Sequence, residues 1–235
     1  PEGAAFYAQT YLPPEPRGGQ PSLTQVVEAV TTAWSEKRED VLESSRALVG
    51  ALADAAAAIE KDSKNQVFPS TEQLSVIVNA LIAQEDIEFG GFGGAPKFPV
   101  APALSYLQGE GLAGSEPAAK FVARTLATYA QSDLRDSLEG GFFRYATMRD
   151  FSEPHYERML YDNAGLLSLY SREDDLDSAA GIVSFLRSTL LVEGGFGSAQ
   201  DSESIIEGQP SEGGYYQLDA AGREGLIPPK VDDKV

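Results

Sequence analysis

The sequence predicts a mainly α-helical fold built from repeated helical hairpins, and two observations support this prediction. Apolar residues recur at helical spacing in most segments after residue 20. In addition, three Gly-Gly-Phe turns begin at residues 90, 140 and 194, and each interval has room for about two helices. A period in this range is typical of stacked helical pairs, arranged either as an open solenoid or as a closed α/α toroid. The simpler alternative is three unrelated helix ends.

The first part of the chain contains one strand-like segment and two expected helices. Residues 4–12 mix aromatic and small residues as a strand does, and the prolines and glycines that follow end this segment. Ser22 predicts a helix start, because Gln25 follows three residues later in a capping-box arrangement. A second helix is expected over residues 39–60.

The remaining elements are expected to be helices joined by the glycine turns. Ser70 predicts another helix start, and further helices are expected over 101–109, 116–132, 153–171 and 175–191. Paired glycines allow positive φ at a turn, and the phenylalanine after them can pack back onto the helices. In a toroid these turns would gather at one rim, where a binding site would lie.

Composition argues against several classes of function. The formal net charge is −18, and such a surface repels phosphate backbones and anionic lipid, so neither nucleic acid nor a membrane is an expected partner. With no cysteine and one histidine, neither thiol chemistry nor a protein-only zinc site is expected, and no metal or cofactor is predicted. No apolar run is long enough to span a bilayer, and we expect a cytoplasmic protein. Both ends of the sequence look cut, so a fragment is expected.

The segment 153–171 places polar side chains among apolar ones. On a helical wheel, His155, Asp162 and Asn163 all lie within the apolar arc. A buried carboxylate needs a partner, and Arg144 on the preceding turn is the expected partner of Asp162. Three interpretations remain open. These groups staple the glycine turn to the helix, or they face a hollow and contact a polar ligand, or the register of the predicted helix is misplaced.

Two more side chains are candidate ligand contacts. Lys97, in the loop APKFP, can reach a ligand, although a salt bridge is the commoner role of a loop lysine. Asp201 begins the acidic segment 201–204, which lacks the ligand spacing of a calcium-binding loop and is more simply a helix-capping turn.

Three segments carry distinctive motifs: GGFGGAPKFP at 90–99, GGFFRYATMRDFSEPHYERMLYDNA at 140–164, and GGFGSAQDSES at 194–204. With residues 1–15 they resemble the spermatogenesis-associated protein 20-like family of thioredoxin-domain-containing proteins. The resemblance implies the C-terminal remnant of a thioredoxin-like α/β domain with linking helices over 1–62. The first half of an (α/α)6 toroid, related in fold to N-acylglucosamine 2-epimerases and six-hairpin glycosidases, would occupy 63–235. The family's cysteine motif would lie upstream, and Glu139 departs from the family pattern.

The resemblance implies two functions of different class. The first is carbohydrate binding or metabolism with a sugar or polyol ligand, in which a base that titrates near neutral pH is needed. Glycoside hydrolysis would instead use two carboxylates, Asp162 and Asp201. The second is a non-catalytic interaction domain of a thioredoxin-like redox adaptor. Self-association is also expected, because cut ends would expose apolar helix faces. The candidate catalytic residues are His155 and Asp162, and the candidate ligand-binding residues are Arg144, Asn163, Asp201 and Lys97.

Overall fold

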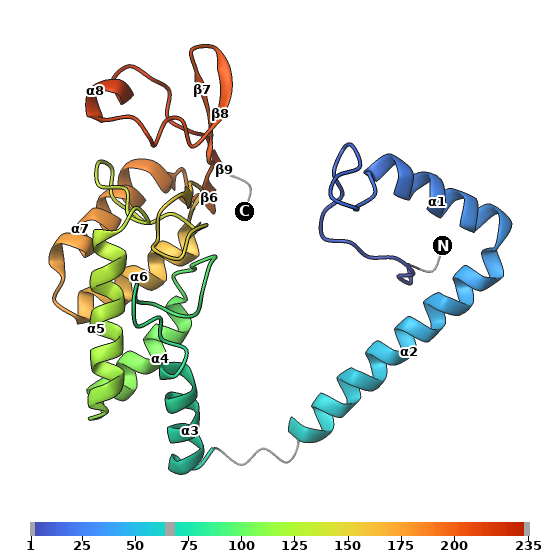
Figure 1. Ribbon diagram of the computed structural model, residues 1–235, viewed down its shortest axis with the longest axis horizontal. Helices are drawn as coiled ribbons and strands as arrows, with labels where there is room; N and C mark the ends of the chain where they lie inside the picture. Colours follow the sequence, from blue (N-terminus) through green and yellow to red (C-terminus); the bar gives the residue numbers. More distant parts are fainter. Residues whose placement is uncertain (1–2, 64–68, 233–235) are drawn as a thin grey trace. The chain divides into compact units, whose positions relative to one another are not determined.

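The computed structural model describes residues 3–63 and 69–232 (Figure 1). The chain divides into two compact units, residues 1–68 and 69–235, and each is described by itself. The sequence places this boundary between residues 62 and 63. Among the described residues, none of the helices combines the length and the apolar character needed to cross a membrane.

Unit 1 consists of an extended segment and two packed helices, α1 (Leu23–Glu36) and α2 (Arg38–Ser63). The predicted capping box at the start of α1 is confirmed. The Ser22 hydroxyl accepts a hydrogen bond from the Gln25 backbone N–H at 3.3 Å, and the Gln25 side chain accepts one from the Ser22 N–H at 3.1 Å. The α1 helix has no buried residue, so its apolar face is only partly covered within this unit.

The strand predicted over residues 4–12 is wrong, because this segment has no regular secondary structure. A strand needs a neighbouring strand to satisfy its backbone hydrogen bonds, and the described part of unit 1 contains none to pair with it. The segment is instead held by side chains. Phe6 stacks against Trp34 of α1 with ring centroids 6.4 Å apart, and the Ser45 hydroxyl donates to the Ala5 carbonyl at 3.0 Å.

Unit 2 is an array of helical hairpins, which confirms the predicted mainly α-helical fold. Helix α4 packs on α5, α6 packs on α7, and α4 also packs on α6. The core between them contains fully buried side chains from α4 and α6, such as Leu104 and Leu166. The helices of this array are α3 (Thr71–Ile82), α4 (Ala101–Leu112), α5 (Glu116–Gln131), α6 (Leu160–Arg172) and α7 (Leu176–Phe185), which continues into a π-helix at Leu186–Leu190.

Short strands lie between and after these helices. The hairpin β1–β2, the three-stranded sheet β3–β6–β9, and the hairpins β4–β5 and β7–β8 are all antiparallel. A short helix, α8 (Ala220–Arg223), follows the last hairpin. The strands are β1 (Tyr145–Ala146), β2 (Pro154–His155), β3 (Arg158–Met159), β4 (Leu191–Val192), β5 (Gly195–Phe196), β6 (Ala199–Gln200), β7 (Glu203–Ile206), β8 (Gln209–Glu212) and β9 (Val231–Asp232).

Two of the three glycine turns are structural repeats, and the third is not. In the first turn (residues 86–92) and the second turn (residues 136–142), both glycines have positive φ and an aspartate four residues before the first glycine closes the turn. In both, the phenylalanine packs on an aromatic ring of a helix, as predicted. The third turn (residues 194–196) instead runs from the tip of the β4–β5 hairpin into β5, and its phenylalanine is 40% exposed.

The helix predicted over 153–171 begins only at Leu160. Residues 154–155 form β2 and residues 158–159 form β3, and these strands pair with β1 and β6 respectively. Glu153 has a φ of 53°, which interrupts a right-handed helix at this point. The helical wheel is therefore wrong for His155, which lies on β2, whereas Asp162 and Asn163 do lie in the first turns of α6.

Candidate functional site

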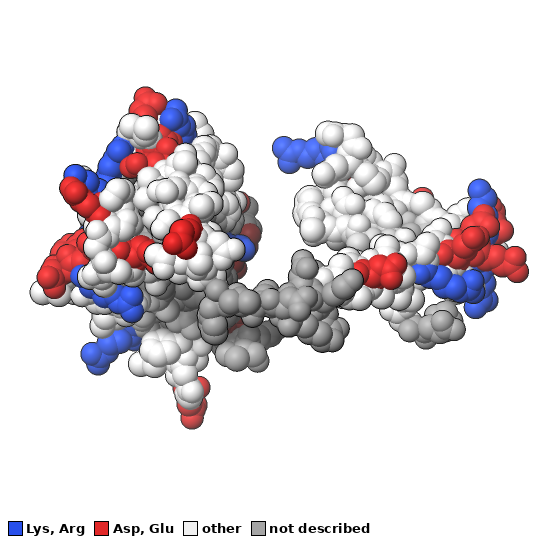
Figure 2. Space-filling model, turned by 90° about the horizontal axis from the view of Figure 1, so that it is seen from below, with Lys and Arg blue, Asp and Glu red and all other residues white. Residues whose placement is uncertain are grey.

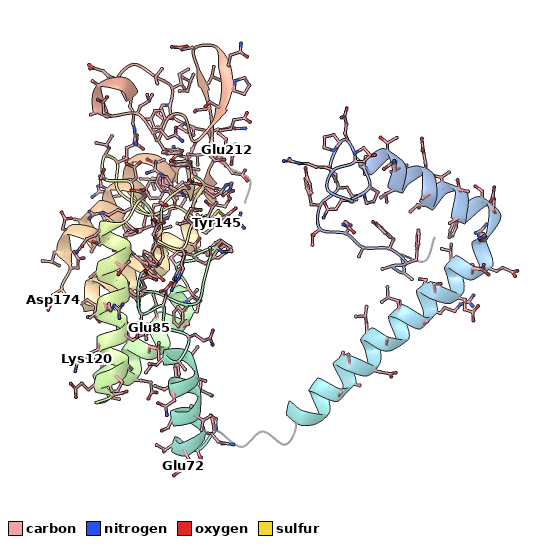
Figure 3. The ribbon with its side chains drawn as sticks, in the orientation of Figure 1. Glu72, Glu85, Lys120, Tyr145, Asp174 and Glu212 are labelled. Atoms are coloured by element: carbon pink, nitrogen blue, oxygen red, sulfur yellow. The ribbon has the colours of Figure 1, made fainter. Side chains whose placement is uncertain are left out.

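The candidate site is a group of charged side chains around Glu157, which lies between β2 and β3. The Arg144 guanidinium bonds to Glu157 Oε2 at 2.7 Å, and His155 Nε2 lies 3.7 Å from the same oxygen. On its other edge, His155 Nδ1 lies 3.2 Å from Glu212 Oε1 at the end of β8. We call Arg144, His155, Glu157, Asp162 and Glu212 the Glu157 cluster. Figure 3 labels Glu212 and Tyr145, which lie along the same edge of unit 2 in this view.

An aromatic ladder adjoins this cluster. Tyr145 and His155 are opposite each other in the β1–β2 register, and their rings stack with centroids 5.0 Å apart and planes 20° apart. Phe98 stacks on the Tyr145 ring at 4.7 Å and 27°, and Phe98 remains 46% exposed. The ladder therefore presents a partly exposed aromatic surface that ends at the only histidine of the chain.

Asp162 contributes a carboxyl group that is a weaker acid than an ordinary aspartate. Burial raises its pKa to about 6, and the positive charge of Arg144 opposes this effect without cancelling it. A hydrogen bond with Tyr161 also lowers the pKa, and the negative charge of Glu157 raises it. A half-buried carboxyl group that titrates near neutral pH can accept or donate a proton under ordinary conditions.

An open hollow of about 240 Å³ adjoins the other side of Glu157. It lies beside the β6–β9 pair, where the Asp201 N–H donates to the Lys230 carbonyl at 2.8 Å. Glu157 belongs both to this hollow and to the Glu157 cluster, so the two form one continuous surface. The hollow, which we call the acidic hollow, is lined by Glu157, Ala199, Asp201, Lys230 and Asp232.

The structure brings four of the predicted site residues to this surface. His155 and Arg144 both contact Glu157, Asp162 interacts electrostatically with Arg144 and Glu157, and Asp201 lines the acidic hollow. The predicted ion pair differs in one respect. Arg144 bonds to Glu157 rather than to Asp162, because the segment between β2 and β3 that carries Glu157 runs beside Arg144, whose backbone N–H donates to the Glu157 carbonyl at 2.8 Å.

Asn163 and Lys97 are not brought to the surface. Asn163 is fully buried, and its amide bonds to the Phe142 N–H and to the carbonyl oxygens of Phe142 and Met159 at 2.7 to 3.0 Å. Lys97 is 1% exposed, and its ammonium donates to Asp86 Oδ2 at 2.8 Å and to the carbonyl oxygens of Gly90 and Gly93. Asn163 therefore staples the second turn to α6, and Lys97 closes the first turn.

A buried arginine, which the sequence analysis did not identify, supports the site from beneath. Arg158 is fully buried and donates to the Gly140 carbonyl at 2.8 Å, to Asp136 at 3.2 Å and to Glu139 at 2.7 Å. Arg223 also bonds to Asp136, at 2.9 Å. The sequence signal that could have revealed this network is the position of Asp86 and Asp136, each four residues before a glycine pair. The local sequence around Arg158 and Arg223 does not indicate that they bind these turns.

Arg158 connects the segments that carry the acidic side chains of the site. It follows Glu157 directly, and its side chain bonds to Gln200, which precedes Asp201. Side chains alternate along a strand, so Arg158 and Gln200 point inward while their acidic neighbours point outward. Glu139, a partner of Arg158, also accepts a hydrogen bond at 2.5 Å from the Tyr215 hydroxyl, three residues after Glu212.

Fold and site together define a helical-hairpin protein with an acidic, aromatic-flanked surface beside its second glycine turn. Spermatogenesis-associated protein 20 of Homo sapiens is 34% identical over 250 residues, covering 96% of this chain and 30% of that protein. The Mus musculus protein of the same name is 31% identical, with the same coverage of both chains. The chain belongs to the spermatogenesis-associated protein 20-like family and spans 30% of the length of these relatives.

Other comparisons concern parts of the chain. Residues 1–53 match the Thioredox_DsbH family, described as a protein of unknown function, DUF255. A sugar epimerase from a ruminal bacterium is similar in structure, with a TM-score of 0.47 and 18% identity over 53% of this chain and 37% of that chain. The cellobiose 2-epimerase of Spirochaeta thermophila gives a TM-score of 0.44 and 24% identity over 56% of this chain and 41% of that chain. Over the residues that the structure describes, no group of three or more His, Cys, Asp or Glu side chains is arranged to hold a metal ion.

Proposed function

We propose that unit 2 binds a sugar or polyol at the Glu157 cluster. The observation that carries this proposal is the aromatic ladder of Phe98, Tyr145 and His155, which ends among carboxylates that are within hydrogen-bonding reach of a ligand. Carbohydrate ligands present apolar C–H faces and many hydroxyl groups, so they suit a surface that combines rings with ionised acceptors.

Each part of the surface has a role in this proposal. The partly exposed Phe98 ring packs against one face of the sugar ring, and Tyr145, stacked between Phe98 and His155, supports this platform. Glu157 and Glu212 accept hydrogen bonds from hydroxyl groups, while Arg144 orients Glu157 and can donate to a ring or carbonyl oxygen. The acidic hollow receives the substituent at one end of the ligand.

The same surface contains groups suited to proton transfer. Histidine is a residue type commonly used for proton transfer in proteins, and burial raises the pKa of Asp162 to about 6. Sugar isomerisation and epimerisation both require a base that removes a proton next to a carbonyl group. We propose His155 as this base and Asp162 as the group that returns the proton, which extends carbohydrate binding to carbohydrate metabolism.

The proposal is tested by titrating the 235-residue chain with neutral mono- and disaccharides and observing the ligands by saturation-transfer NMR. We expect signals from the ring protons, and their loss in Tyr145→Ala and Glu157→Gln. Lys120→Gln is the matched control, because Lys120 forms only an exposed pair with Glu116 within α5. The absence of transfer to every sugar in the wild-type chain would refute binding. Deuterium uptake from solvent into a bound aldose then tests the proton transfer separately.

A second candidate function, an interaction domain, is favoured by unit 1. Its helices leave large apolar side chains exposed, including Val27 at 53% and Leu52 at 60%. A hollow of about 500 Å³ lies between the extended segment and the two helices, with Phe6, Trp34 and Leu42 among its lining. Figure 2 shows a broad uncharged area on unit 1 on the face drawn. Apolar surface of this kind is typical of an interface, which supports the proposal that the chain self-associates or binds another polypeptide.

Sedimentation velocity over a wide concentration range tests this second candidate. We expect the chain to associate as its concentration rises, and Val27→Ser to shift the equilibrium toward monomers. Val76→Ser is the control, because Val76 is even more exposed, at 67%, but lies on α3 of unit 2. A single monomeric species at every concentration would count against self-association.

A further inference from the structure

We propose that the Glu157 cluster and the acidic hollow select a sugar or polyol that carries a free amine over its neutral, N-acylated and phosphorylated counterparts. This inference rests on the proposed carbohydrate binding and deepens it by naming the charge of the preferred ligand. It is carried by the balance of charged side chains on the surface that the ligand would contact.

Acidic side chains outnumber basic ones around the site. Five carboxyl groups face two basic side chains, Arg144 and Lys230, and counting His155 as a cation still leaves an acidic excess. The excess is greatest at the acidic hollow, where Lys230 is the only basic side chain in the described lining. The five are Glu157, Asp162, Asp201, Glu212 and Asp232.

Arg144 does not offset this excess for a ligand, and Lys230 offsets only part of it. Arg144 is bonded to Glu157 at 2.7 Å, so its charge is already partnered within the protein. Glu212 remains 66% exposed beside His155, and Asp201 uses one carboxylate oxygen to accept from the Glu203 N–H at 3.0 Å. Each keeps acceptor capacity for a ligand, and an ammonium group supplies three donors together with the complementary charge.

The same charges disfavour the related ligands. A phosphate or carboxylate on the sugar would meet an excess of carboxylates, with the Lys230 ammonium as the one cation in the described lining of the acidic hollow, and the net charge of −18 adds a long-range repulsion. N-acylation removes the positive charge and two of the three donors, so an N-acyl sugar loses the advantage of the amine. The aromatic ladder contacts the sugar ring, which is common to all of these ligands, and therefore does not distinguish between them.

The test compares five probes on the intact chain by ligand-observed NMR titration: glucosamine, glucose, N-acetylglucosamine, glucosamine 6-phosphate and ethanolamine. At about pH 7 we expect glucosamine to bind roughly fivefold more tightly than glucose, which is the effect of one partly exposed charge pair. The preference should vanish near about pH 9.5, where an amine of this kind has lost its proton but the carboxylates remain ionised. Asp201→Asn should move the glucosamine-to-glucose affinity ratio toward one. Asp174→Asn, at an exposed position outside the site, should leave the ratio unchanged.

The outcomes separate this inference from the proposed function. If glucose binds and glucosamine has no advantage, or if N-acetylglucosamine binds as tightly as glucosamine, the amine preference is overturned and carbohydrate binding stands. If ethanolamine binds as tightly as glucosamine, the site is a general cation attractor and the inference also fails. If no sugar binds, both proposals fail together.

Discussion

The first and second glycine turns have the same backbone hydrogen bonds but bind different basic side chains. This difference distinguishes the aromatic part of the candidate site from its acidic part. In each turn the first glycine donates its N–H to the backbone carbonyl of the aspartate. One carboxylate oxygen of the aspartate accepts from the backbone N–H groups of the residues two and three positions after it. A buried cation then bridges the other carboxylate oxygen and the carbonyl of that glycine. It is Lys97 in the first turn and Arg158 in the second.

The two cations place different neighbours on the surface. Lys97 precedes Phe98, and its backbone pairs with Ala146 next to Tyr145, so the first turn supports the aromatic ladder. Arg158 follows Glu157 and bonds to Gln200 beside Asp201, so the second turn supports the acidic side chains. The planar fork of arginine reaches several acceptors at once, whereas the lysine ammonium is a compact charge. The comparison teaches that one turn design, repeated, supplies both the apolar and the charged part of one surface.

The largest expected effect is the loss of the buried arginine. Arg158→Met should lower the free energy of unfolding by about 3–5 kcal/mol, because Asp136, Glu139 and the Gly140 carbonyl each lose a buried partner. Lys97→Met should cost less, roughly 2–3 kcal/mol, because only one carboxylate, that of Asp86, loses an ion-pair partner, whereas the loss of Arg158 affects two. Urea denaturation of both variants measures the difference. Equal losses would mean that the two turns are energetically interchangeable.

The glycines of the three turns should show a graded response to alanine. At Gly140 a Cβ would lie 2.2 Å from the Gly181 carbonyl oxygen, whereas at Gly90 it would lie 2.7 Å from a movable Thr128 hydroxyl. At Gly194 nothing lies within 4 Å, so only the positive φ of 88° is penalised. We expect losses of roughly 2–5 kcal/mol at Gly140, less at Gly90, and about 1 kcal/mol at Gly194. Thermal melts of the three variants test this order, and a loss at Gly194 as large as at Gly140 would contradict it.

The helices and turns of unit 2 were predictable because their signals are local. The capping box at Ser70 starts α3 as expected, with the Ser70 hydroxyl accepting from the Gln73 N–H at 3.3 Å. The spacing of the glycine pairs likewise predicted the two helical hairpins between the turns. The error at residues 153–159 arose because this segment pairs with β1 and with β6, a distant strand, and no local pattern shows such pairing.

The candidate site was predictable only where its members are close in the chain. Arg144, His155 and Asp162 lie within one motif, so the sequence already grouped them. Glu212 reaches His155 from a hairpin more than fifty residues away, and Arg223 reaches Asp136 from further still. Contacts of this kind depend on the tertiary fold, and the sequence alone contains no periodicity that indicates them.

A smaller loss of stability is expected when the second basic side chain that binds the aspartate of each turn is replaced. This side chain is Arg149 in the first turn and Arg223 in the second. Arg223 bonds to Asp136 with its side chain 8% exposed, whereas the equivalent cation of the first turn, Arg149, is 49% exposed. Arg223→Gln should lower the free energy of unfolding by about 1–3 kcal/mol, since Asp136 and Glu139 lose a buried charge partner. Arg149→Gln should have a clearly weaker effect, because water can replace an exposed guanidinium. Urea denaturation at matched salt compares the pair, and a larger loss in Arg149→Gln would reverse the proposed ranking.

The smallest expected effect is a difference in how the protein's stability depends on pH. It distinguishes Asp86, in the first turn, from Asp162, in the candidate site. Hydrogen bonds from Arg149, and then from Lys97, hold the pKa of Asp86 well below its usual range, so Asp86 stabilises the fold throughout the range above its unfolded pKa of 3.8. Asp162 has the opposite sign, because burial raises its pKa to about 6 from 3.8. The folded state then holds the Asp162 proton more tightly than the unfolded state does. Ionised Asp162 therefore destabilises the fold above about pH 6, and this penalty disappears as the pH falls from about 7 to about 4.

For a half-exposed group the penalty should be on the order of 1 kcal/mol. Asp162→Asn should remove it, so that the variant is more stable than the wild type at about pH 7 and equal to it near about pH 4. Asp174→Asn is again the control, since it removes an exposed aspartate outside both the turns and the site. Urea denaturation across this range measures the difference between each variant and the wild type. A constant difference for Asp162→Asn at every pH would mean that the site holds Asp162 ionised as firmly as the turn holds Asp86.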